Sequence, residues 1–202
     1  MISQFGFKII CGISRCVLFL WHPVFRVYGR ENVPQDGPLL ICPNHSGMAD
    51  PFWTVFAIRP RQRMRFMAKK EAMDTPVIGA ILRWLGVFGV DRGGADVNAI
   101  KTGLKSLKDG HMLLVFPEGT RVRKGKTVEA KAGAVLLSNR TGTPILPVYV
   151  SPRKAPFSPV TCVIGKPVLP EFDDKRPKEA ELQAAAQQIM NDTYELRKQA
   201  CR

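Results

Sequence analysis

The sequence is poor in histidine and cysteine, the residues that most often build metal and redox sites. Its 202 residues include 3 His and 5 Cys. The three histidines are far apart in the chain, and neither a C-x-x-C pair nor an H-E-x-x-H motif occurs, so we expect no metal site. Scattered cysteines in an odd number indicate reduced thiols rather than a disulfide framework.

Acidic residues are also few. The 17 Asp and Glu face 30 Lys and Arg, which gives a net charge of +13. This excess indicates an anionic partner, such as nucleic acid, anionic lipid or a phosphorylated substrate, although a solvated basic surface would give the same charge. Residues 59–70 alone hold six cations and no acid. The basic and aromatic residues do not interleave as on a nucleic-acid stacking surface, which favours lipid or phosphate.

A hydrophobic run long enough to cross a membrane is missing from the N-terminal region. Lys8 and Arg15 interrupt the roughly 20-residue uncharged stretch that a spanning helix needs, and no signal-peptide cleavage pattern follows. On a helix, apolar residues surround a narrow polar stripe of Gln4, Lys8, Cys11 and Arg15. This pattern favours a helix in the membrane interface, and the alternative is a helix packed on the protein's own core. We therefore expect a membrane-association segment at 1–27 and one domain at 28–202.

Strand-like and helical patterns alternate from residue 39 onward. Short apolar runs typical of buried strands cover 39–42, 87–90, 111–116, 144–150 and 161–165, and amphipathic patterns lie between them. The alternation predicts a single α/β domain, with a largely parallel mixed sheet flanked by helices, behind the N-terminal membrane-interface helical segment. Ligands of such sheets bind beyond the carboxyl ends of the strands. His45, Arg92 and the sequence PEGTR at 117–121 follow predicted strand ends.

His45 and Asp50 lie five positions apart in the sequence NHSGMADPF. A carboxylate beside a histidine fixes the ring tautomer and stabilises the imidazolium, which suits a general base. The structural alternative is that Asp50 is an N-cap, with Pro51 at the first helical position. Cys42 and Ser46 are nearby nucleophiles, and a covalent intermediate is the weaker alternative.

The sequence FPEGTR at 116–121 could simply end a strand. It also places main-chain N–H groups beside Glu118 and Arg121, and an arginine fork binds phosphate well. A dense anion site would then form from Arg121, Arg123, Lys124 and Lys126. Arg92, in a glycine-rich turn, and Lys69 are weaker candidates for phosphate contacts.

The segments NHSGMAD, GVFGVDR, FPEGTR and ILPVYV follow the order and spacing of the four sequence blocks of the glycerolipid acyltransferases. The chain resembles this family over about residues 29–150. The resemblance implies that His45 is the general base, with Asp50 as its orienting partner, in a direct transfer without an acyl-enzyme. It further implies acceptor and phosphate binding by Arg92, Glu118, Gly119, Thr120 and Arg121, and Asn44 is a possible oxyanion donor.

The resemblance implies transfer of a fatty acyl group from acyl carrier protein or coenzyme A to the sn-2 hydroxyl of lysophosphatidate, giving phosphatidate for phospholipid biosynthesis. We expect no bound cofactor, no nucleic acid, and a peripheral or monotopic location at the cytoplasmic face of the cell membrane, on an anionic surface. Departures such as Gly47-Met48 and Val122-Arg123 leave other acceptors open, including glycerol 3-phosphate, other lysophospholipids or a non-glycerolipid. A silent lipid-binding protein and a basic nucleic-acid-binding module are the alternatives from other classes.

Overall fold

The computed structural model describes residues 4–60, 64–91, 96–122, 128–152, 155–174 and 176–200. In these ranges, seven strands form one sheet in the order β1-β7-β6-β2-β5-β3-β4. Neighbouring strands are parallel except for the antiparallel pair β6–β7. The strands are β1 (Phe25–Tyr28), β2 (Leu39–Pro43), β3 (Met64–Lys69), β4 (Val87–Val90), β5 (Met112–Leu114), β6 (Ile145–Val150) and β7 (Val160–Ile164).

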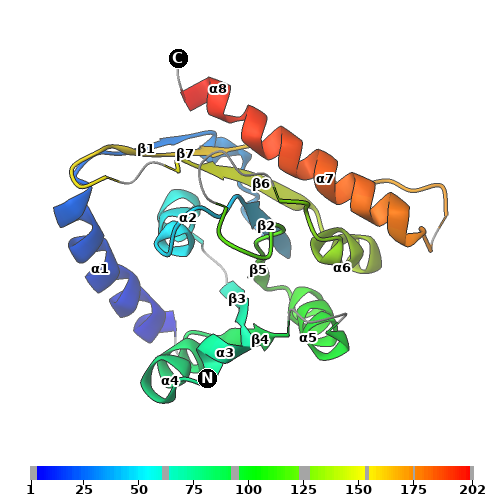
Figure 1. Cartoon of the computed structure of the whole chain (residues 1–202), viewed down its shortest axis with the longest axis horizontal. Coiled ribbons are helices and arrows are strands. Elements are labelled where there is room, and N and C mark those ends of the chain that lie inside the picture. Colours follow the sequence, from blue (N-terminus) through cyan, green and yellow to red (C-terminus); the bar gives the residue numbers. More distant parts are fainter. Residues whose placement is uncertain are drawn as a thin grey trace.

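Helices cover both faces of the sheet, with α1 and α2 on one side and α5, α6 and α7 on the other (Figure 1). The α-helices are α1 (Gln4–Trp21), α2 (Asp50–Ile58), α3 (Lys70–Met73), α4 (Pro76–Trp84), α5 (Val97–Lys108), α6 (Gly133–Thr141), α7 (Glu179–Glu195) and α8 (Arg197–Ala200). A 3₁₀ turn, η1, spans Arg30–Asn32. The predicted α/β fold with a largely parallel mixed sheet is therefore confirmed.

The core consists of two apolar layers, one on each side of the sheet. The first core layer packs against α1 and α2, and the second core layer packs against α5, α6 and α7. Side chains of β2 alternate between them, so that Leu39 and Ile41 pack toward α1 and α2 while Leu40 and Cys42 pack toward α5, α6 and α7. Because both faces are covered, β2 reads in the sequence as a continuous apolar run rather than an alternating one. The central strands are thereby fixed, and their ends provide a rigid base for the loops above them.

Several elements differ from the predicted ones. The domain boundary expected between residues 27 and 28 falls inside β1, which pairs in parallel with β7 at the edge of the sheet. This strand is only four residues long and alternates between half-buried and exposed positions, so it carries little sequence signal. The strand expected at 111–116 is shorter, because β5 covers only Met112–Leu114.

Helix α1 packs on the protein's own core with one side only, and its place in a membrane interface stays a prediction. Phe7, Cys11, Leu18 and Phe19 pack against the core, whereas the opposite side exposes Ile9 (45%), Ile13 (61%), Val17 (52%) and Leu20 (76%). The assignment of Cys11 to a polar stripe is wrong, because Cys11 lies on the core side. The helix is thus anchored to the domain and also presents an apolar surface. Within the described part of the chain, no helix has the length and hydropathy to span a membrane.

Candidate active site

Five neighbouring strands are parallel: β6, β2, β5, β3 and β4. Their carboxyl ends therefore lie together along one edge of the sheet, the edge that runs across the strands. Asn44, the first residue after β2, is buried there. Its amide nitrogen donates to the Val150 carbonyl (3.0 Å), and its amide oxygen accepts from the Val150 N–H (2.7 Å). These two bonds tie the end of β2 to the end of β6. The amide predicted as a possible oxyanion donor therefore forms a main-chain clamp in this structure.

The loop after Asn44 brings His45 and Asp50 together. His45 Nδ1 lies 3.1 Å from Asp50 Oδ2, with the imidazole 15% exposed and the carboxylate fully buried. The same oxygen accepts from the main-chain N–H groups of Ser46 (2.6 Å) and Gly47 (2.7 Å). An Nδ1–H donor to Asp50 leaves Nε2 with its lone pair free to accept a proton. The predicted pair thus has the geometry of a histidine general base.

The predicted N-cap at Asp50 is wrong by one residue. Helix α2 begins at Asp50, with Ala49 at the N-cap position and no side-chain capping bond. The Asp50 carboxylate instead turns back to the loop that precedes the helix. It still lies at the positive end of the helix dipole, which favours its ionised form. The helix therefore supports the carboxylate that orients His45.

The 116–122 turn holds His45 from three sides. The Phe116 ring stacks on the imidazole, with a centroid distance of 4.0 Å and an interplanar angle of 24°. The Glu118 carboxylate accepts from the His45 N–H at 2.6 Å, and the Val122 N–H donates to the His45 carbonyl at 2.7 Å. The first and third sequence blocks therefore form one hydrogen-bonded unit at the sheet edge.

Glu118 is only 3% exposed, and both of its carboxylate oxygens have protein partners. Oε2 accepts from the His45 main chain, and Oε1 accepts from the Tyr194 hydroxyl of α7. Burial raises the pKa of Glu118, while the hydrogen bonds from Tyr194 and His45 act in the opposite direction. Acceptor binding was predicted for Glu118, but its carboxylate faces the protein. Sequence reasoning missed Tyr194, because nothing in the sequence of α7 distinguishes this tyrosine from its neighbours.

The rest of the turn exposes cations. Gly119 has a φ of +63°, and a Cβ there would lie 3.0 Å from Cε of Lys131, so the lysine side chain lies across the glycine. The main-chain N–H of Lys131 donates to the Pro117 carbonyl at 2.8 Å. Thr120 and Arg121 are exposed, and Arg121 directly precedes the residue that binds the His45 carbonyl. Two exposed cations, Arg121 and Lys131, therefore lie in or against the turn that holds His45.

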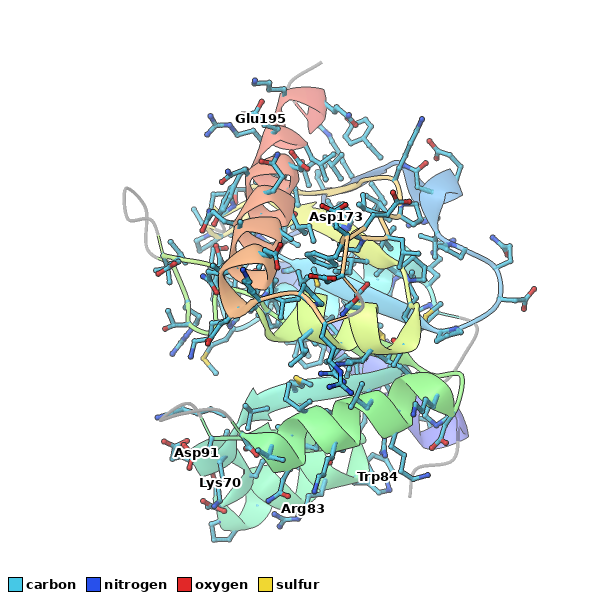
Figure 2. All side chains as sticks on the ribbon, turned by 90° about the vertical axis from the view of Figure 1, so that its right-hand side faces the viewer. Lys70, Arg83, Trp84, Asp91, Asp173 and Glu195 are labelled. Atoms are coloured by element: carbon cyan, nitrogen blue, oxygen red, sulfur yellow. The ribbon has the colours of Figure 1, made fainter. Side chains whose placement is uncertain are left out.

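Lys69 ends β3 at the same edge of the sheet. Its Nζ lies 2.6 Å from Glu71 Oε1, and the side chain is half exposed. Figure 2 shows Lys70 and Asp91 close together at the end of β4, far from Glu195 at the end of α7. Arg92 and three residues of the predicted anion site, Arg123, Lys124 and Lys126, lie outside the described residues, as does the 61–63 part of the basic stretch.

Neither candidate nucleophile is placed for attack with His45 as its base. Cys42 is fully buried in the second core layer, and burial raises the pKa of its thiol to about 12. The Ser46 hydroxyl lies 3.4 Å from Asp50 Oδ2, on the side of His45 that faces the aspartate. The site therefore favours a base that activates a bound hydroxyl over a covalent enzyme intermediate.

The family model described as Acyltransferase matches residues 24–151, from just before β1 to just after β6. The chain belongs to the Acyltransferase family. The match includes His45, Asp50 and the 116–122 turn, whereas Tyr194 lies outside it.

The chain is also similar to two curated relatives and to one solved structure. It is 37% identical over 122 residues to "1-acyl-sn-glycerol-3-phosphate acyltransferase" of Bacillus subtilis, covering 60% of each chain. It is 34% identical over 128 residues to the protein of the same name from Borreliella burgdorferi, covering 60% of this chain and 49% of that one. The chain thus spans about half to three fifths of these relatives. The crystal structure of the 1-acyl-sn-glycerophosphate (LPA) acyltransferase PlsC from Thermotoga maritima matches with a TM-score of 0.71 and 25% identity, over 96% of this chain and 81% of that chain.

Proposed function

We propose that this acyltransferase moves a fatty acyl group from an acyl thioester to the sn-2 hydroxyl of lysophosphatidate, producing phosphatidate. The observation that carries the proposal is the His45–Asp50 pair, fixed at the sheet edge next to the exposed Arg121. The relatives named as 1-acyl-sn-glycerol-3-phosphate acyltransferases support the choice of acceptor. The two acyl donors to be tested are the thioesters of acyl carrier protein and of coenzyme A.

The reaction follows from the orientation of the imidazole. Nε2 of His45 removes the proton of the acceptor hydroxyl as its oxygen attacks the thioester carbonyl carbon. The new C–O bond forms, the C–S bond breaks, and the proton passes from the imidazolium to the departing thiolate. Asp50 stabilises the imidazolium, because its buried carboxylate lies against Nδ1. The acyl group passes directly between the substrates.

The acceptor phosphate requires cations at the same edge of the sheet. Arg121 is exposed directly beside the segment that holds His45, and Lys69 ends the neighbouring strand β3. A guanidinium binds phosphate through two parallel N–H bonds, whereas an ammonium acts as a point charge. Arg121 is therefore our first candidate for the phosphate contact, with Lys69 second.

A membrane surface supplies the lipid acceptor in this proposal. The exposed apolar side of α1 continues to Trp21 at its end, and the N–H of Phe157 donates to the Trp21 carbonyl at 2.6 Å. The Phe157 side chain is 71% exposed, with a φ of +61°. An apolar helix face with aromatic residues at one end, in a protein of net charge +13, suits peripheral or monotopic binding to an anionic cytoplasmic leaflet.

The test gives the purified protein a labelled fatty acyl donor, as the thioester of either acyl carrier protein or coenzyme A. The acceptors are lysophosphatidate, glycerol 3-phosphate and a panel of other lysophospholipids, and the products are identified by mass. We expect phosphatidate from lysophosphatidate, and loss of this product in His45→Ala with unchanged circular dichroism. His111→Ala is the matched control, because His111 precedes β5 at the opposite edge of the sheet. Normal turnover in His45→Ala would refute the mechanism, and preference for a non-phosphorylated acceptor would refute the substrate.

A further inference from the structure

Tyr194 connects helix α7 to the candidate active site. It lies one residue before the end of α7 (Glu195 in Figure 2), a helix that packs on the second core layer through Leu182, Ala186, Ile189 and Met190. The Tyr194 ring is partly buried against that layer, and its hydroxyl donates to Oε1 of Glu118. A rigid helix thus delivers one hydroxyl to a buried carboxylate.

Glu118 passes this contact on to the histidine. Its other oxygen, Oε2, accepts from the His45 main-chain N–H at 2.6 Å. A change in the position of the carboxylate would therefore move the main chain of His45, and with it Nε2. Misplacement of a catalytic group by about 1 Å can cost about 100-fold in rate.

We propose that Tyr194 is a positioning residue for acyl transfer, since its hydroxyl fixes the carboxylate that holds the His45 main chain. The inference rests on the acyl transfer proposed above. Tyr194 has no contact with the reacting atoms in this arrangement, so it acts through Glu118. Its predicted effect is on kcat rather than on the binding of either substrate.

The hydroxyl also favours the ionised form of Glu118. Burial raises the pKa of this carboxyl, and the Tyr194 hydrogen bond is the largest of the effects that lower it. The other ionisable groups that act on Glu118 are His45, which lowers the pKa, and Asp50, which raises it. Without the Tyr194 hydroxyl, Glu118 takes up a proton at higher pH, and a neutral carboxyl accepts the His45 N–H bond less strongly.

The kinetic test is Tyr194→Phe, which removes one oxygen and keeps the ring. We expect kcat to fall about 10-fold to 100-fold at acid pH, the range that a hydrogen bond to a charged group supports. KM for both substrates should be unchanged, and the acid limb of the kcat profile should move to higher pH. The same substitution in a Glu118→Gln background should cause no further shift, since the titrating group is gone. Tyr28→Phe, at an exposed tyrosine of the edge strand β1, is the matched control.

A second measurement is independent of the enzymatic activity. Protein labelled with ¹⁵N-histidine gives amide signals from the 3 histidines only, and His45→Gln identifies the signal of His45. We expect Tyr194→Phe to shift this signal, with its pH titration, while the signals of His22 and His111 stay in place. If wild type lacks acyl transfer, the proposed function fails, yet this shift still tests the positioning role. An unchanged His45 signal together with an unchanged kcat profile would overturn the inference. Equal shifts of all three histidine signals would also overturn it, as would a pH-independent decrease in kcat accompanied by an increase in KM.

Discussion

Asp50→Asn tests the charge that orients His45 while it keeps an oxygen acceptor for the loop. Asn keeps the size of Asp, and its amide oxygen can still accept from the N–H groups of Ser46 and Gly47. It removes the negative charge that lies 3.1 Å from Nδ1. If the amide nitrogen turns toward the ring instead, it donates to Nδ1 and favours the tautomer with its proton on Nε2, which cannot act as the base.

The size of the effect follows from the role of the pair. General base catalysis contributes about 100-fold to 10,000-fold, which corresponds to about 3–5 kcal/mol of activation free energy. We expect kcat to fall within this range, with little change in KM, because neither substrate contacts the buried carboxylate. The free energy of unfolding should fall by about 1–3 kcal/mol, since hydrogen bonds to a charged acceptor are replaced by bonds to a neutral one.

The assay measures initial rates with lysophosphatidate and both thioester donors, together with urea unfolding of the same preparations. Asp109→Asn is the control, because the Asp109 carboxylate forms an exposed i,i+4 ion pair with Lys105 at the end of α5. Wild-type kcat in a folded Asp50→Asn protein would refute the orienting role. A loss of activity that tracks the loss of folded protein would assign Asp50 to stability alone.

Three further predictions test the acceptor site, the membrane surface and the buried carboxylate. Arg121→Ala should raise KM for lysophosphatidate about 10-fold or more, with Arg140→Ala on α6 as an exposed control, and an equal loss with a non-phosphorylated acceptor would contradict a phosphate contact. Ile13→Glu or Val17→Glu on the exposed side of α1 should weaken sedimentation with anionic vesicles about 10-fold each; Leu169→Glu, at the opposite end of β6 from Asn44, should not, and equal losses in all three would contradict a defined membrane face. Burial raises the pKa of Glu118, so as the pH falls the folded state takes up this proton before the unfolded chain does. The free energy of unfolding of wild type, minus that of Glu118→Gln, should therefore increase as the pH falls from neutral through the raised pKa. A constant or decreasing difference in urea titrations would contradict this direction.

Patterns that depend on burial and short spacing could be predicted from the sequence. The apolar run 39–42 predicts β2 because both faces of that strand are covered, and the helix at 97–108 follows from its amphipathic period. The pairing of His45 with Asp50 was predictable as chemistry, since a histidine base needs a carboxylate partner.

Contacts between distant segments were not predictable in the same way. Nothing in the local sequence shows that the amide of Asn44 pairs with Val150, 106 positions away, or that Tyr194 meets Glu118, 76 positions away. Edge strand β1 lacks the long apolar run of a central strand, so its four residues resemble the end of the N-terminal segment. Each of these features depends on the order of strands in the sheet, which no local pattern encodes.

The five-residue spacing of His45 and Asp50 is explained by what one oxygen does. Residues five apart on a helix point in directions about 140° apart, so the pair requires a turn. Oδ2 of Asp50 accepts from Ser46 N, Gly47 N and His45 Nδ1, and it therefore curls the loop and orients the ring with the same atom. Since Asp50 is also the first residue of α2, the helix dipole stabilises the charge of its carboxylate. The geometry of the base is thus built into the fold of the loop, and a substitution that alters the charge of Asp50 must affect both together.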